Sequence, residues 1–289
     1  MKNWLLITTF FGLWLSTQLP SDIQDYFAYA LILTFGVLHG ANDIVLLKKQ
    51  HENLKTTKAI IPYILVISTV TLLFLFSRTL VLAIFILISG YHFGEQHYKE
   101  KLAYSHWFHN LFFIFYGLSI LFMIFYTNLE EVQQIIYDVS GHLVQREYIE
   151  LGFLVNLIGL SGSLVFLTLN KVLRVQWAKE IFMFLVLYIV FKVASLLWAF
   201  SIYFILWHSI PSIKDQMEVL YGSSKPRYFI NYLRSSWIYW FVSVVGLLVL
   251  YLLLKNQIEY FITVVLYVLA VITFPHVIVM SKLEKNKGI

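Results

Sequence analysis

The sequence predicts an all-α, polytopic integral membrane protein, a bundle of about eight to ten transmembrane helices. Two observations support this fold class. Of the 289 residues, 60% are hydrophobic, 18% are aromatic and only 13% are charged, with a mean hydropathy of +0.76. A soluble chain of this length needs far more polar side chains to cover its surface. The apolar residues also gather in runs that approach the roughly 20 residues needed to cross a bilayer.

Nine apolar runs follow one another along the chain. They lie at residues 4–17, 26–47, 59–77, 79–97, 107–126, 150–169, 178–210, 236–254 and 260–281. The first has no small-residue cleavage site and precedes many more runs, so we expect a short helix there instead of a signal peptide. The seventh run would be roughly 50 Å long as one helix, which exceeds the hydrocarbon core. We therefore expect two short helices in 178–210, and ten crossings in all.

The distribution of basic residues supports ten crossings. With both termini on the inside, only Arg78, Arg146, Lys192 and Lys255 of the 21 lysines and arginines fall outside. This is the asymmetry of the positive-inside rule. It predicts a multi-pass protein of the cell (inner) membrane with both termini in the cytoplasm, and it gives no reason to expect a nucleic-acid partner. No internal repeat appears, so we expect residues 1–289 to form a single transmembrane domain.

The chain has nine histidines and no cysteine, so any metal ligands must be nitrogen or oxygen atoms. Four histidines lie at membrane depth or at the ends of apolar runs. They are His39 in "VLHGAND", His92 in "GYHFGEQH", His208 in "ILWHSIPS" and His276 in "TFPHVIVM". We expect ordinary surface or interfacial positions for the others outside this set, His51, His106, His109 and His142. His97 lies about 140° around the helix from His92 and would join a site with it only after local unwinding.

A simpler interpretation treats each membrane histidine as a polar contact between helices. Gly40, Gly90 and Gly94 would then serve close helix packing, and Pro211 and Pro275 would be kinks. The four histidines, however, come from four separate helices, and the ten-crossing topology places them all at the inner half of the membrane or its inner edge. Unrelated polar contacts would not favour one level. We therefore expect the four imidazoles to share a site.

Four converging imidazoles without a thiolate suit Fe, Zn, Cu or Ni. A redox-active, non-haem iron with open positions for O₂ fits the surrounding phenylalanine, tyrosine and tryptophan best, because these would accept a long apolar substrate from the lipid. Metal-bound histidines usually donate their other ring N–H to a carboxylate or a carbonyl. Asp43, four residues after His39, and Glu95, three after His92, are the candidates for that role, and His97 is a further supporting candidate.

The motifs "HGANDIVLL", "YHFGEQH", "WHS" and "FPH", in this order and over nearly the full chain, carry a family resemblance. The sequence resembles the Brp/Blh family of membrane β-carotene 15,15'-dioxygenases, which make retinal in rhodopsin-bearing bacteria and archaea. The resemblance implies an iron(II) enzyme that adds O₂ across the central double bond of β-carotene, in the bilayer, and releases two all-trans-retinal molecules. It also implies that the retinal is supplied to a microbial rhodopsin.

The resemblance further implies that His39, His92 and His208 bind the iron. The family pattern often has a second histidine four residues after the one in "HS", and this chain has Ser212 there. We therefore expect His276, which matches the family's "PH" motif, to be the fourth ligand in preference to His97. The aromatic residues before His208 are expected to position the polyene against the iron, or else to face lipid. They are Trp198, Phe200, Tyr203, Phe204 and Trp207.

Two other functions remain open from the sequence. A membrane di-iron desaturase or hydroxylase also uses histidines and O₂, but such enzymes resemble one another in clustered HxxxH and HxxHH boxes, and this chain has no HxxHH. A transporter with proton-relaying histidines is the non-enzymatic alternative. It predicts broken helices paired across two repeated halves, which the sequence does not show.

Overall fold

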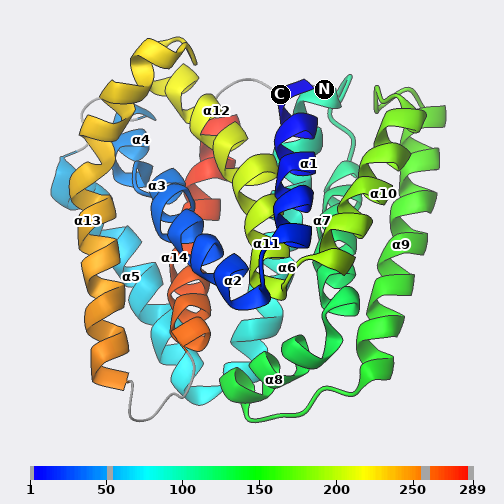
Figure 1. Cartoon of the computed structure of the whole chain (residues 1–289). Helices are drawn as coiled ribbons and strands as arrows, with labels where there is room; N and C mark the ends of the chain where they lie inside the picture. Colours follow the sequence, from blue (N-terminus) through cyan, green and yellow to red (C-terminus); the bar gives the residue numbers. More distant parts are fainter. Residues whose placement is uncertain (1–2, 51–54, 255–260, 286–289) are drawn as a thin grey trace. The chain divides into compact units, whose positions relative to one another are not determined.

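The computed structural model of the chain describes residues 3–50, 55–254 and 261–285 (Figure 1). His51 and Lys255 lie outside the described residues. The protein is 88% helical, and its described residues form no strand. The all-α class is thus confirmed.

Eight helical segments are long and apolar enough to cross a membrane. They are Ser21–Gln50, Thr56–Phe76, Arg78–Lys101, His109–Thr127, Arg146–Leu169, Leu196–Tyr221, Pro226–Leu254 and Phe261–Lys282. Two apolar helices are slightly shorter, α1 (Asn3–Gln18) with 16 residues and α10 (Trp177–Val193) with 17. The prediction of about eight to ten helices is confirmed by these segments within the described part of the chain. The number of actual crossings and their direction stay predictions.

The run 178–210 is divided as expected. Helix α10 ends at Val193 and α11 (Leu196–Ile202) begins after Ser195, whose hydroxyl accepts a hydrogen bond from the Trp198 backbone N–H. The Ser195 hydroxyl also donates to Asp25 at 2.6 Å, and its backbone N–H donates to the Gln24 side chain at 3.0 Å. These polar contacts satisfy the backbone at the break.

The structure corrects one boundary. The seventh apolar run was predicted to end at residue 210, but α11 continues through the π-helix η3 (Tyr203–Ser209) into α12 (Ile210–Tyr221). Pro211 therefore lies within a continuous helical segment, directly after the π-helix. The sequence also gave no expectation of α8 (Leu129–Ser140), a short amphipathic helix between α7 and α9. Its length and acidic first turn suit a connection at the membrane edge better than a crossing.

The chain divides into two compact units. The first unit is 1–32, 86–137 and 143–209, and contains α1, α2 (Ser21–Leu31), most of α6 (Arg78–Tyr98), α7 (His109–Thr127), most of α8, α9 (Arg146–Leu169), α10, α11 and η3. Close backbone contact holds α6 against α7. A Cβ atom on Gly94 would overlap the Phe113 backbone, and one on Gly117 would overlap that of Gly90. Gly90 and Gly94 therefore permit close helix packing.

The second unit is 33–85, 138–142 and 210–289. It contains most of the π-helix η1 (Ile32–Gly36), followed by α3 (Val37–Gly40), α4 (Asp43–Gln50), α5 (Thr56–Phe76), α12, α13 (Phe229–Leu254) and α14 (Phe261–Lys285). Helix α14 packs against α4 and α5 through two apolar clusters. These are centred on Leu46, Val279 and Met280 and on Val70, Val81 and Val271. The packing places the α14 histidine beside the α3–α4 break.

Candidate metal centre

His39 and His276 form a buried pair in the second unit. Their exposed fractions are 7% and 3%, and their ring centroids lie 4.7 Å apart at an interplanar angle of 85°. His39 lies at the end of α3, directly after the π-helical turn of η1, and its Nδ1 contacts the backbone carbonyl of Gly36. A neutral imidazole that donates from Nδ1 keeps its Nε2 lone pair for another partner.

Asp43 supports the second member of this pair. The carboxylate is 1% exposed, and one of its oxygens lies 2.9 Å from Nδ1 of His276. The other oxygen accepts a hydrogen bond from the Tyr63 hydroxyl at 3.1 Å. With Nδ1–H directed at the carboxylate, the Nε2 atom of His276 is the one that would bind a metal, as in carboxylate–histidine–metal arrangements. Asp43 thus contacts His276, and its role as a supporting carboxylate stays a prediction.

His92 and His208 form a similar buried pair in the first unit. Each is 2% exposed, and their ring centroids lie 4.8 Å apart at 77°. His208 belongs to the π-helix η3. π-Helices are rare in proteins, but those that occur are often found at functional sites. A Glu95 oxygen lies 3.9 Å from Nδ1 of His92, and Tyr91 donates a hydrogen bond to the other Glu95 oxygen at 2.7 Å. This pair thus also has a tyrosine and a carboxylate beside one histidine. The carboxylate–histidine distance is 3.9 Å here, against 2.9 Å for Asp43 and His276.

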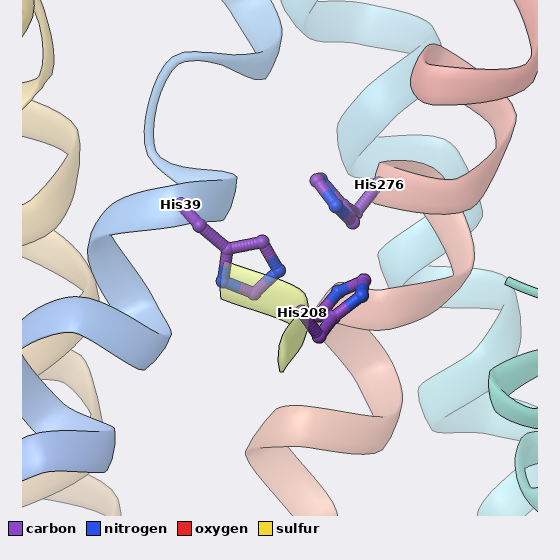
Figure 2. Close-up of side chains that lie close together, drawn as sticks. All are labelled: His39, His208 and His276. Carbon is purple, nitrogen blue, oxygen red and sulfur yellow. The ribbon is translucent and has the colours of Figure 1, made fainter. Parts of the chain in front are cut away.

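Three of these histidines could hold a metal ion. His39, His208 and His276 each offer one ring nitrogen to such an ion (Figure 2). All three side chains are buried. Among the described residues this is the one group of its kind, and His92 packs against the His208 ring within the first unit. Neutral nitrogen donors in a dry interior suit a borderline metal such as iron or zinc.

His97 lies in a different environment. Its Nε2 is 3.1 Å from Nζ of Lys101 and 3.7 Å from a Glu180 carboxylate oxygen, and its ring stacks on Tyr116 with centroids 4.9 Å apart. Lys101 also donates to Glu180 at 2.8 Å. His97 therefore has a complete set of partners at the end of α6 and is absent from the three-histidine group. His92 and His97 both lie on α6, five residues apart, so their side chains point about 140° away from each other around the helix.

The five aromatic candidates divide by contact. Phe204 stacks on His208 with centroids 5.6 Å apart, and Phe200 stacks on Phe204 at 5.1 Å, so two rings form a row that ends at the histidine. The two indoles instead donate to α1. Trp198 donates to the Gly12 carbonyl at 3.2 Å and Trp207 to the Thr9 hydroxyl at 3.1 Å.

Tyr203, the fifth candidate, is 1% exposed and packs against Phe93 at 5.4 Å and Phe191 at 6.5 Å. Phe93 in turn contacts His208, with centroids 4.8 Å apart. Phe93 and Phe204 thus contact the His208 ring directly, and Phe200 stacks behind Phe204. Sequence reasoning did not select Phe93, although its position next to His92 was a usable signal.

The two supporting tyrosines were also missed. Tyr91 is four residues before Glu95 on one helix, a spacing at which side chains meet, so it could have been found. Tyr63 is 20 residues from Asp43 on a separate helix, and no local pattern identifies it.

These features define a class of protein, a helical membrane protein with a buried, histidine-lined centre. The family comparison specifies it further. The family model for β-carotene 15,15'-dioxygenase matches residues 30–284, and the chain belongs to that family. The matched range includes all four membrane histidines together with Asp43 and Glu95. Comparison with curated proteins and with solved structures gave no significant match. Family membership gives the chain a carotene dioxygenase type of activity, with β-carotene as the implied substrate.

Proposed function

We propose that this protein cleaves β-carotene at its central 15,15' double bond with O₂, giving two all-trans-retinal molecules, and uses one iron(II) ion bound by histidines. The observation that supports the proposal most strongly is the group of three buried histidines that could hold a metal ion, in a member of this family. One β-carotene and one O₂ account for all atoms of the two aldehydes.

The residues present fit an iron ion. His39, His208 and His276 would hold it, and His92, whose ring lies 4.8 Å from that of His208, would complete the set. Four neutral imidazoles add no negative charge, so the ion would keep its full positive charge in a dry site. Iron, when bound, supplies the redox chemistry with O₂ that no amino-acid side chain offers.

The chain's own groups orient these ligands. Asp43 holds the proton on Nδ1 of His276, and Tyr63 fixes Asp43 from its other oxygen. The Gly36 carbonyl plays the same part for His39. Each contact leaves Nε2 as the donor atom, so the site is arranged before a metal arrives.

The aromatic row next to His208 would position the substrate. The flat faces of Phe200 and Phe204 lie nearly parallel, at 15°, and the Phe204 and His208 rings are at 18°. A straight, flat polyene packs well along such rings, and positioning of its midpoint would select the central double bond. Trp198, Tyr203 and Trp207 would shape the wall behind this row.

The cellular setting follows from this activity. We propose that the whole chain acts as one transmembrane carotenoid-cleaving domain in the cell (inner) membrane, with both termini cytoplasmic. β-Carotene and O₂ would both reach the site from the bilayer, where apolar molecules concentrate. The retinal would be supplied to a microbial rhodopsin.

Expression in a bacterium that accumulates β-carotene tests the proposal. The expected result is loss of the orange colour with appearance of retinal and one iron per purified chain. A His208→Ala variant should keep the colour, and a His142→Ala variant, altered at a histidine of the α8–α9 connection, should lose it as the wild type does. Unchanged β-carotene in cells that express the wild-type protein well would refute the activity. Two iron ions per chain would favour a desaturase-like enzyme, and purification without iron would favour a transporter.

A further inference from the structure

The transmembrane segment that carries His39 is interrupted beside this histidine. Helix α3 ends at Gly40 and α4 begins at Asp43, with a tight turn between them in which the Ala41 N–H donates to the Leu38 carbonyl at 3.1 Å. A broken helix at membrane depth is tolerated only where neighbouring groups satisfy the freed backbone. The partners of the Leu38 and His39 carbonyls therefore decide whether this turn is stable.

Two side chains from other helices contact these carbonyls. The Gln216 amide on α12 donates to the His39 carbonyl at 2.7 Å. The Tyr232 hydroxyl on α13 lies 3.2 Å from the Leu38 carbonyl and 2.9 Å from the Gln216 side-chain oxygen. Gln216 and Tyr232 are both 0% exposed. All of these residues belong to the second unit.

The two donors are themselves fixed. Gln216 also donates to the Ser212 hydroxyl at 3.1 Å, and the Asn42 side chain donates to the Tyr232 carbonyl at 3.3 Å. An apolar cluster that includes Leu38, Ile213 and Met217 surrounds Tyr232. Hydrogen bonds in such a dry environment are strong, and the loss of one partner is costly. Ser212, the position where the family pattern often has a histidine, here serves this network.

We propose that Gln216 and Tyr232 are positioning residues that hold the α3–α4 turn and thereby aim the His39 ring at the metal. This inference rests on the proposed metal centre. The ring direction follows from the backbone at a helix end, and the backbone here is held by donors that come from outside its own helix. Gln216 lies eight residues after His208 on the same continuous helical segment, so one element carries both a proposed ligand and the group that positions another.

Cobalt binding tests this inference without any turnover. Co²⁺ replaces iron or zinc in nitrogen sites, and its visible spectrum reports the geometry of its ligands. Gln216→Leu should weaken Co²⁺ binding by about 10- to 100-fold, the range known for groups that support ligands, and change the spectrum. Tyr232→Phe, which removes a single oxygen atom, should change both in the same direction and serves if Gln216→Leu does not fold.

A matched control separates positioning from general stability. Gln24 is 4% exposed in the first unit, and its amide also donates to two backbone carbonyls at a helix end, those of Ser16 and Leu19. Gln24→Leu should lower the unfolding temperature but leave the Co²⁺ spectrum unchanged.

A double-mutant cycle provides the decisive comparison. If Gln216 acts through His39, then Gln216→Leu should change Co²⁺ affinity by less than about twofold once His39 is already Ala, because coupled residues are not additive. Equal losses in both backgrounds would overturn the inference, as would wild-type spectra and affinities in folded Gln216→Leu and Tyr232→Phe proteins. A wild-type protein that takes up no Co²⁺ would refute the proposed metal centre and this inference with it. If the wild-type protein binds Co²⁺, the Co²⁺ binding of the variants tests only the positioning role of Gln216 and Tyr232.

Discussion

Replacement of Asp43 by asparagine removes one charge from the candidate centre with little change in shape. The carboxylate is 1% exposed and accepts from His276 at 2.9 Å and from Tyr63 at 3.1 Å. Solvent therefore does not screen its interaction with the ring, and a hydrogen bond to a charged group is worth about 1.5–3 kcal/mol. Supporting groups of this kind typically change metal affinity by about 10- to 100-fold. At about 1.4 kcal/mol per tenfold, the two ranges agree.

The assay is a titration of the purified, metal-free protein with Fe²⁺ under anaerobic conditions, alongside the retinal yield in cells that make β-carotene. Asp43→Asn should bind iron about 10- to 100-fold more weakly and give intermediate retinal yield. Asp22→Asn is the matched control, because Asp22 is an exposed carboxylate on the same transmembrane segment. Wild-type affinity in a folded Asp43→Asn protein would refute the role of Asp43, as would an equal loss in Asp22→Asn.

Three further predictions concern the ligands, the packing and the substrate. His276→Ala should lose most bound iron while His97→Ala keeps it, measured as iron per purified chain; the reverse result would make His97 the ligand and require the end of α6 to unwind. Gly117→Ala should reduce the yield of folded protein because its new methyl group overlaps the α6 backbone, whereas Gly162→Ala, with nothing within 4 Å, should change stability by at most about 1 kcal/mol in a thermal-unfolding assay. Equal yields would contradict the packing argument. Phe204→Ala should lower kcat/KM for β-carotene by about two- to tenfold, since an aromatic pair contributes about 0.5–1.5 kcal/mol beyond its buried area, while iron content stays normal; unchanged kinetics would remove this ring from the substrate path.

Hydrophobic runs predicted most of the helices because length and apolar content are local properties. The run 178–210 was too long for one helix, and the structure divides it at Ser195. The end of the next segment was placed too early, since α12 after Pro211 carries charged residues and lies beyond the apolar run. An amphipathic helix that prolongs a transmembrane segment has no hydropathy signal of its own. The short helix α8 escaped prediction for the same reason.

Two properties of the sequence predicted part of the candidate site. They are the depth of the histidines in the apolar runs and the short sequence distances between histidines and carboxylates. His39 and Asp43 are four residues apart, and both contact His276 although a turn separates α3 from α4 between them. Partners on distant helices could not be predicted in this way. Tertiary packing brings Tyr63 to Asp43 and Glu180 to His97.

The division of the aromatic residues also depends on tertiary contacts. Trp198 and Trp207 donate to α1, close to 200 residues away in the chain, whereas Phe200 and Phe204 pack along their own segment towards His208. All five share one apolar, aromatic stretch. A sequence pattern that marks all of them alike carries no information about which ring meets which neighbour.

The π-helical turn at Tyr203–Ser209 has a consequence for how the sequence can change over time. A π turn closes its hydrogen bond one residue later than an α turn, so this segment holds one residue more than a regular helix of the same register. Loss of any one residue there would restore an ordinary helix without moving its ends, yet it would rotate His208 away from its present direction. The direction of this histidine is therefore encoded in a residue count as well as in residue identity. Single-residue deletions in this stretch should be far less tolerated than most substitutions.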